Sequence, residues 1–115
     1  MRLAELAAKI GATVLVPATA QAPIDRVYAG DRISDILNHA ADGTLLVSNL
    51  SGVQLVRLAD LMDLAGLCLV GGAEPDPAIV AAARAHGTGL VVSPVGLFET
   101  CGRIYRCLDA EPGAP

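Results

Sequence analysis

Glycines and small polar residues recur at four places in the sequence, each at the end of a short apolar run. They are Gly30 and Asp31, then Ser48, Asn49, Ser51 and Gly52, then Gly71 and Gly72, and last Ser93. Glycine lets a backbone approach a ligand closely, and the N–H groups at a helix N-terminus favour anions. If the apolar runs are parallel strands, these residues share the edge at which open α/β sheets bind ligands. They are our candidate binding residues for a small anionic metabolite or nucleotide.

A second interpretation of the same residues stays open. Every strand-to-helix loop needs turn and capping residues of these types. The four loops contain no lysine, and their distinctive side chains are Asp31, Arg32 and Asn49. The sequence therefore allows either a ligand site or a set of ordinary turns at this edge.

Known catalytic motifs are missing from the sequence. It contains no G-x-x-x-x-G-K-[ST] phosphate loop, no G-x-S-x-G elbow and no G-x-G-x-x-G fingerprint, and its single lysine is Lys9. We therefore expect no kinase, no dinucleotide-dependent enzyme and no catalytic residues. A small enzyme that uses Cys101 or Ser48 is the least favoured alternative.

The three cysteines, Cys68, Cys101 and Cys107, are an odd number without short paired spacing, which argues against a disulfide framework. With only two histidines to help, they form no zinc-type ligand set, so we expect no metal and no cofactor. The thiols are expected to act as small apolar groups in the core.

The composition limits the partners. Of the 115 residues, 53% are hydrophobic and 17% are charged, which excludes disorder for the body of the chain. The net charge of −4 with eight basic residues leaves no basic face for nucleic acid or an acidic membrane. The N-terminus does not read as a signal peptide, and no apolar run is long enough to span a membrane. We expect a cytoplasmic protein with one domain over residues 1–108 and a frayed tail over 109–115.

Three apolar segments begin at residues 43, 66 and 89, a spacing of 23 residues, and a helical pattern follows each. Continuous apolar runs are typical of parallel strands buried on both faces. Two earlier strands are expected over 13–16 and 24–29, with a helix over 3–10 before them. Asp31, Asp76 with Pro77, and Ser93 with Pro94 are predicted to cap the helices that follow them. The predicted fold is α/β, with three layers and a mainly parallel sheet of about five strands covered by helices on both faces; the places of the first two strands stay open.

The stretch from about Val27 to Leu108 resembles the DRTGG domain, a small α/β module. The matching features are Gly43–Val47, Ala65–Gly72, Glu74–Pro77 and Phe98–Arg103. The family's Thr-Gly-Gly reads Val70-Gly71-Gly72 here. The resemblance implies a stand-alone copy of a module also found in some phosphotransacetylases and similar in fold to the N-terminal domain of HPr kinase/phosphorylase. It implies a regulatory or accessory role without kinase activity.

The apolar content also predicts an assembly surface, because a domain this small cannot enclose all of its apolar side chains. The helix near 52–64 and the last helix, whose broad apolar face we expect to run from Leu97 and Phe98 to Tyr105 and Leu108, are the candidates. We expect a glutamate at Leu61 or Leu97 to disrupt the assembly. The function predicted is a non-catalytic regulatory module, a homodimer that senses a small anion at the strand ends. The alternative is a pure interaction subunit that docks its apolar helices on a larger metabolic enzyme.

Overall fold

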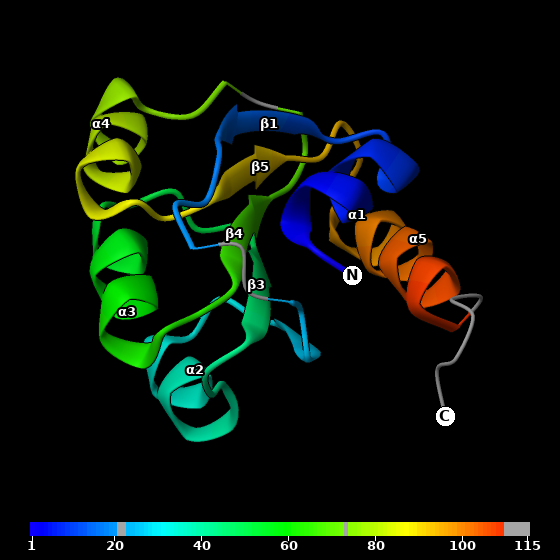
Figure 1. Ribbon diagram of the computed structural model, residues 1–115, viewed down its shortest axis with the longest axis horizontal. Helices are drawn as coiled ribbons and strands as arrows, with labels where there is room; N and C mark the ends of the chain where they lie inside the picture. The colour runs from blue at the N-terminus through cyan, green and yellow to red at the C-terminus, as the bar shows by residue number, and fades with distance from the viewer. Residues whose placement is uncertain (21–22, 73, 110–115) are drawn as a thin grey trace.

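The protein is a five-stranded sheet between two layers of helices (Figure 1). The structure is a computed structural model and describes residues 1–20, 23–72 and 74–109. Its elements, in chain order, are α1 (Leu3–Ile10), β1 (Thr13–Val16), β2 (Arg26–Ala29), α2 (Ile33–His39), β3 (Thr44–Ser48), α3 (Gln54–Met62), β4 (Gly66–Leu69), α4 (Pro77–His86), β5 (Leu90–Val92) and α5 (Leu97–Asp109).

The strand order is β1-β5-β4-β3-β2, and the four strands from β2 to β5 are parallel. β1 joins the sheet at its edge, antiparallel to β5. The three segments spaced by 23 residues are therefore neighbours that run the same way, as predicted. The carboxyl ends of β2, β3, β4 and β5 lie along one edge of the sheet, which we call the carboxyl edge, and the opposite one is the amino edge.

Side chains alternate between the two faces of the sheet, so each face has its own core. Leu46 and Leu67 pack with helices α2, α3 and α4, whereas Leu45 and Cys68 pack with α1 and α5. Figure 1 shows the same division, with α2, α3 and α4 on one side of the sheet and α1 and α5 on the other. The predicted three-layer α/β fold is confirmed. None of the helices in the described ranges is long and apolar enough to cross a membrane.

Two of the three predicted helix caps are wrong. Asp76 does cap α4, because its Oδ1 accepts a hydrogen bond from the N–H of Ala78 at 2.9 Å. Asp31 does not cap α2, which begins at Ile33 with Arg32 in the cap position and no side-chain cap bond. Ser93 and Pro94 do not start α5, which begins three residues later, at Leu97. In both cases the side chain is held by another part of the fold, as described below.

Two other sequence expectations need correction. The second strand begins at Arg26 and not at residue 24, because the N–H of Ile24 donates to the carbonyl of Met1 instead of joining the sheet. The last helix does not bury one broad apolar face: Leu97 and Ile104 pack toward α1, but Phe98 and Tyr105 are 94% and 72% exposed. Residues 110–115 of the predicted tail lie outside the described residues, and Asp109 ends α5.

The three cysteines are free thiols in very different surroundings. Burial, with a smaller effect from the neighbouring Cys101, raises the pKa of Cys68 to about 12, and burial also raises the pKa of Cys101. We expect iodoacetamide at pH 8 to label the half-buried Cys107 first and Cys68 at least about tenfold more slowly, because the thiolate is the reactive form. Mass spectrometry of the labelled peptides measures the order. Equal rates in the native protein would contradict it, whereas equal rates in urea are the expected control.

Candidate functional site

The fold brings the predicted site residues to the carboxyl edge in two groups. Asp31, Ser48 and Asn49 meet where β2 and β3 end. Gly71, Gly72 and Ser93 meet where β4 and β5 end. Ser48 stands opposite Leu69 in the register of β3 and β4, so the two groups lie on neighbouring strands.

Asp31 is the centre of the first group. Its Oδ1 accepts hydrogen bonds from the Ser48 hydroxyl at 2.9 Å and from the Asn49 N–H at 2.8 Å. Its Oδ2 accepts from the Asn49 side-chain amide at 3.1 Å. The Ser48 hydroxyl in turn accepts from the N–H of Leu50 at 3.1 Å. The carboxylate therefore ties the loop after β2 to the loop after β3, and this is why it does not cap α2.

The hydrogen bonds also fix the charge of this side chain. Burial alone raises the pKa of Asp31, but the bonds from the Asn49 backbone, the Asn49 side chain and the Ser48 hydroxyl outweigh it and lower the pKa below its usual value. Asp31 is thus a carboxylate at neutral pH. Because the two negative charges repel each other, an anion cannot bind to this side chain. Any anion at this edge must therefore bind to backbone N–H groups beside it.

The glycines of the second group are engaged within the chain. Gly71 donates its N–H to the carbonyl of Val95 at 2.7 Å, and Gly72 donates to the carbonyl of Ser93 at 2.9 Å. Both glycines have positive φ, 88° and 68°. Their immediate role is a left-handed turn that joins the end of β4 to the loop after β5.

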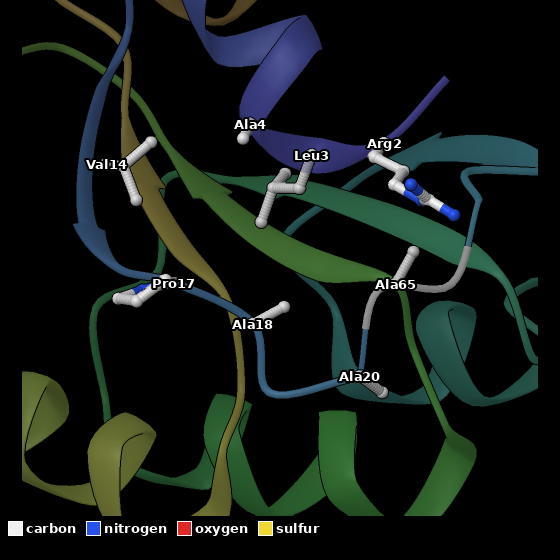
Figure 2. A pocket seen from close by; sticks show the side chains of 8 residues that line it. All are labelled: Arg2, Leu3, Ala4, Val14, Pro17, Ala18, Ala20 and Ala65. Atoms are coloured by element: carbon white, nitrogen blue, oxygen red, sulfur yellow. The ribbon is translucent and has the colours of Figure 1, made fainter.

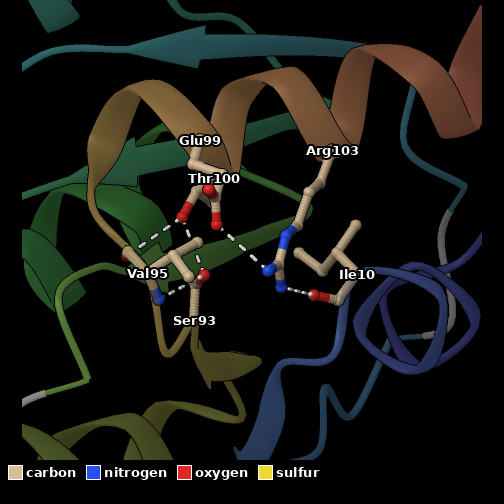
Figure 3. Close-up of polar contacts among 6 residues, drawn as sticks. All are labelled: Ile10, Ser93, Val95, Glu99, Thr100 and Arg103. Carbon is tan, nitrogen blue, oxygen red and sulfur yellow. Dashed lines mark hydrogen bonds and ion pairs between the residues drawn. The ribbon is translucent and has the colours of Figure 1, made fainter.

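Ser93 is fully buried and is held by α5 (Figure 3). The Thr100 hydroxyl lies 2.7 Å from the Ser93 hydroxyl and 3.2 Å from the Val95 carbonyl, and the Val95 N–H lies 3.4 Å from Ser93 Oγ. Thr100 was not among the residues predicted from the sequence. Its position could have indicated a role, because it lies one turn before Ile104 on the buried side of the last helix, where a polar side chain needs a hydrogen-bond partner.

The remaining candidates are Gly30, Ser51 and Gly52. Gly30 donates its N–H to the carbonyl of Val47 at 3.0 Å and so extends the pairing of β2 with β3. Ser51 and Gly52 lead into α3, and their N–H groups donate to no other residue in the described part of the chain. Both are backbone donors at the carboxyl edge that, within the described part of the chain, stay available to an anion.

The structure also shows hollows away from this edge. One of them lies at the amino edge and has a volume of about 50 Å³. Figure 2 shows the residues that line it, among them Arg2 and Leu3 at the start of α1. Among the described residues, no three histidine, cysteine or acidic side chains are grouped so as to hold a metal ion.

Gly71 and Gly72 provide a matched test of the left-handed turn after β4. A Cβ on Gly71 would meet nothing within 4 Å, whereas a Cβ on Gly72 would lie 3.1 Å from the carbonyl oxygen of Pro94. We expect Gly71→Ala to cost about 1–2 kcal/mol in the free energy of unfolding, from its positive φ alone. Gly72→Ala should cost measurably more, because that backbone contact is added. Urea unfolding compares the two variants, and equal losses would contradict the contact.

Comparison with known proteins supports the fold. No protein-family model matches the sequence, and no curated protein matches it. A solved structure of the CBS and DRTGG domains of the regulatory region of Clostridium perfringens pyrophosphatase, complexed with its activator diadenosine tetraphosphate, is similar with a TM-score of 0.75 and 12% identity. The match covers 90% of this chain and 45% of that chain, so this chain spans less than half of its neighbour's length. At this identity the likeness shows a shared α/β fold and is consistent with the predicted DRTGG-like architecture.

Proposed function

We propose that this protein is a non-catalytic regulatory or accessory module of the DRTGG type that works as a homodimer joined through α5. The neighbour of the same fold belongs to a regulatory region and not to a catalytic domain, which supports the role. The observation that carries the dimer is the exposure of two aromatic side chains on one helix. Free thiols, one of them fully buried, fit a reducing compartment, and we place the module in the cytoplasm.

Phe98, Gly102 and Tyr105, which we call the α5 stripe, follow one another at intervals of four and three residues and so lie on one face of the helix. Both aromatic side chains are largely exposed. A Cβ on Gly102 would meet nothing within 4 Å, so the packing of this chain does not require a glycine there. Glycine inside a helix costs about 1 kcal/mol relative to alanine. A second helix that packs closely against Gly102 would explain why a glycine stands there, and it would cover both aromatic rings.

The charges beside the α5 stripe favour a second copy as the partner. In the sequence, Glu99 comes three residues before Gly102 and Arg106 comes four residues after it. When two α5 helices cross antiparallel at Gly102, Glu99 of each copy therefore comes opposite Arg106 of the other. Glu99 already contacts Arg103 of its own chain at 3.0 Å, and its side chain stays 60% exposed and accessible to a second cation. The surface is thus self-complementary, as a two-fold interface must be.

A ligand at the carboxyl edge is the second part of the proposal. Of the candidate residues, Ser51 and Gly52 would supply the donors, whereas Gly30, Asp31, Ser48, Asn49, Gly71, Gly72 and Ser93 shape the edge through their bonds within the chain. The N–H groups of Ser51 and Gly52, which precede α3 and bond to no other residue that the structure describes, suit a small anion. The activator of the pyrophosphatase region is a nucleotide, which supports nucleotides as the first class to test.

A thermal-shift screen with nucleotides and phosphorylated metabolites tests this second part. A site occupied at 100 times its dissociation constant adds about 2.7 kcal/mol of stability. The expected result is a raised melting temperature with one class of anion, which is lost when proline replaces Ser51 and removes its N–H. No shift with any compound would favour the alternative, a pure interaction subunit.

The alternative has its own surface. Ile33, Leu37, Leu58 and Leu61 line an almost wholly apolar groove between α2 and α3, the α2–α3 groove. Leu61 is 77% exposed and Leu37 is 49% exposed. A larger enzyme that docks here would act on a face of the sheet opposite to α5, so both surfaces can be used at once.

A further inference from the structure

We infer that a hollow at the amino edge, between the ends of α3 and α4, binds a small primary ammonium ion. The hollow has a volume of about 290 Å³ and is separate from the candidate site at the carboxyl edge. Its polar lining comes from Asp60 and Asp63 at the end of α3, from His86 and Thr88 at the end of α4, and from Thr19 in the loop after β1. We call it the amino-edge hollow.

Two helix C-termini give this hollow a negative electrostatic potential. Asp63 is the C-cap residue of α3 and Gly87 is the C-cap residue of α4, and both residues line the hollow. The carbonyl groups at a helix C-terminus carry partial negative charge and favour cations. The carboxylates of Asp60 and Asp63 add two full charges to the same place. The side chain of Asp63 has no hydrogen bond or ion pair with any residue that the structure describes.

Asp63 keeps its carboxylate at an unfavourable backbone position. It has a φ of 52°, the one positive φ among the described residues other than glycine. Glycine and asparagine adopt this left-handed conformation more readily than aspartate does. The geometry of the helix end therefore does not by itself require a carboxylate at this position.

Thr88 supplies an independent indication of a ligand. It is 9% exposed, and its hydroxyl forms no hydrogen bond within the described part of the chain. No buried side-chain oxygen that the structure describes is both unbonded and closed to solvent, so the Thr88 hydroxyl opens to the space that the residue lines. An unpaired hydroxyl in such a place is a ready hydrogen-bond acceptor.

The donors of a primary ammonium group match these acceptors. Its three N–H groups need three acceptors, and the hollow is lined by the Asp63 carboxylate, the Asp60 carboxylate and the Thr88 hydroxyl. His86 Nδ1 lies 3.4 Å from Asp60 Oδ2, so a cation at Asp60 would compete with His86. Asp63 has no such contact with any residue that the structure describes.

An amide NMR titration with n-butylammonium chloride, against sodium chloride at equal ionic strength, tests the site. We expect saturable shifts confined to residues 18–20, 59–65 and 86–89. Tetramethylammonium, which has the same charge and no N–H, should bind at least about tenfold more weakly, since the loss of a hydrogen bond to a charged group has that effect. Asp63→Asn, which keeps the backbone conformation, and Thr88→Val, which keeps the shape, should each weaken binding by about the same factor.

The matched control is Glu74→Gln, which removes one negative charge from the carboxyl edge and should leave binding unchanged. Equal binding of the two ammonium ions would overturn the proposal, because it would show attraction by the general negative charge. Unchanged affinity in Asp63→Asn would overturn it even if Thr88→Val failed to fold. Shifts that spread over other acidic residues would overturn it as well. None of these outcomes depends on the dimer or on the anion site.

Discussion

Phe98→Glu is expected to halve the mass of the particle in solution, from dimer to monomer. In the proposed interface the two Phe98 rings lie under a second α5 helix, and a carboxylate in that place would lose its hydration without gaining a partner. The folded chain itself should be unaffected, because Phe98 is 94% exposed and an exposed substitution of this kind changes stability by less than about 0.5 kcal/mol. Light scattering at several concentrations measures the mass, and thermal unfolding of the monomeric variant checks the fold.

Leu61→Glu is the matched control for that experiment. The sequence alone made Leu61 a candidate for the assembly surface. It is 77% exposed on α3, in the α2–α3 groove on the other face of the sheet, so with the interface placed on α5 the same change of charge there should leave the mass unchanged. Leu97→Glu is not suitable, because Leu97 packs against the core beside α1 and its loss would disturb the fold. A monomeric wild-type protein would contradict the proposed dimer. A monomer with Leu61→Glu and a dimer with Phe98→Glu would move the interface to the α2–α3 groove.

The charges allow a sharper form of the test. Arg106→Glu places a carboxylate opposite Glu99 of the second copy and should weaken the dimer. Adding Glu99→Arg to that variant reverses both charges and should restore the dimer. Failure of the second change to restore any association would contradict the antiparallel crossing at Gly102.

Asp31→Ala is expected to lower the free energy of unfolding by about 1–2 kcal/mol and the melting temperature by several degrees. The change removes three hydrogen bonds, one of them from the buried Ser48 hydroxyl, and it frees the loops after β2 and β3 from one another. Because Asp31 is itself exposed, water compensates part of the loss. Asp35→Ala is the control: its 3.7 Å contact with Arg32 is an exposed ion pair and should contribute at most about 1 kcal/mol.

The effect of Asp31 should depend on pH in a defined direction. Its pKa in the folded protein is below the ordinary value of 3.8. The stability that the carboxylate adds is therefore present above pH 3.8 and is lost as the pH falls through the folded-state pKa. The difference between wild type and Asp31→Ala in urea unfolding should be smaller at pH 3 than at pH 7. An equal or larger difference at pH 3 would show that the charge of Asp31 is not what holds the loops.

The sequence by itself determined the central layer of this protein. Three uninterrupted apolar segments at equal spacing, each followed by a helical pattern, are typical of parallel strands covered on both faces, because each strand has side chains such as Leu45 and Leu46 that point to opposite sides. The cap at Asp76 was equally predictable, since the residue bonds to the N–H of Ala78 two positions away. Local spacing carries this information, and no distant residue alters it.

Tertiary structure decided the features for which local and distant partners compete. Asp31 was predicted to cap a helix, but it accepts hydrogen bonds from the loop after β3 instead. Ser93 was predicted to cap the last helix, but its hydroxyl is bonded to that of Thr100 on α5. The edge positions of β1 and β2, and the exposure of Phe98 and Tyr105, depend on which neighbours cover each surface. A periodic pattern shows that a residue lies on an apolar face of its helix. Whether that face is buried depends on how far the adjacent layer reaches, and this is set by packing among segments distant in the sequence.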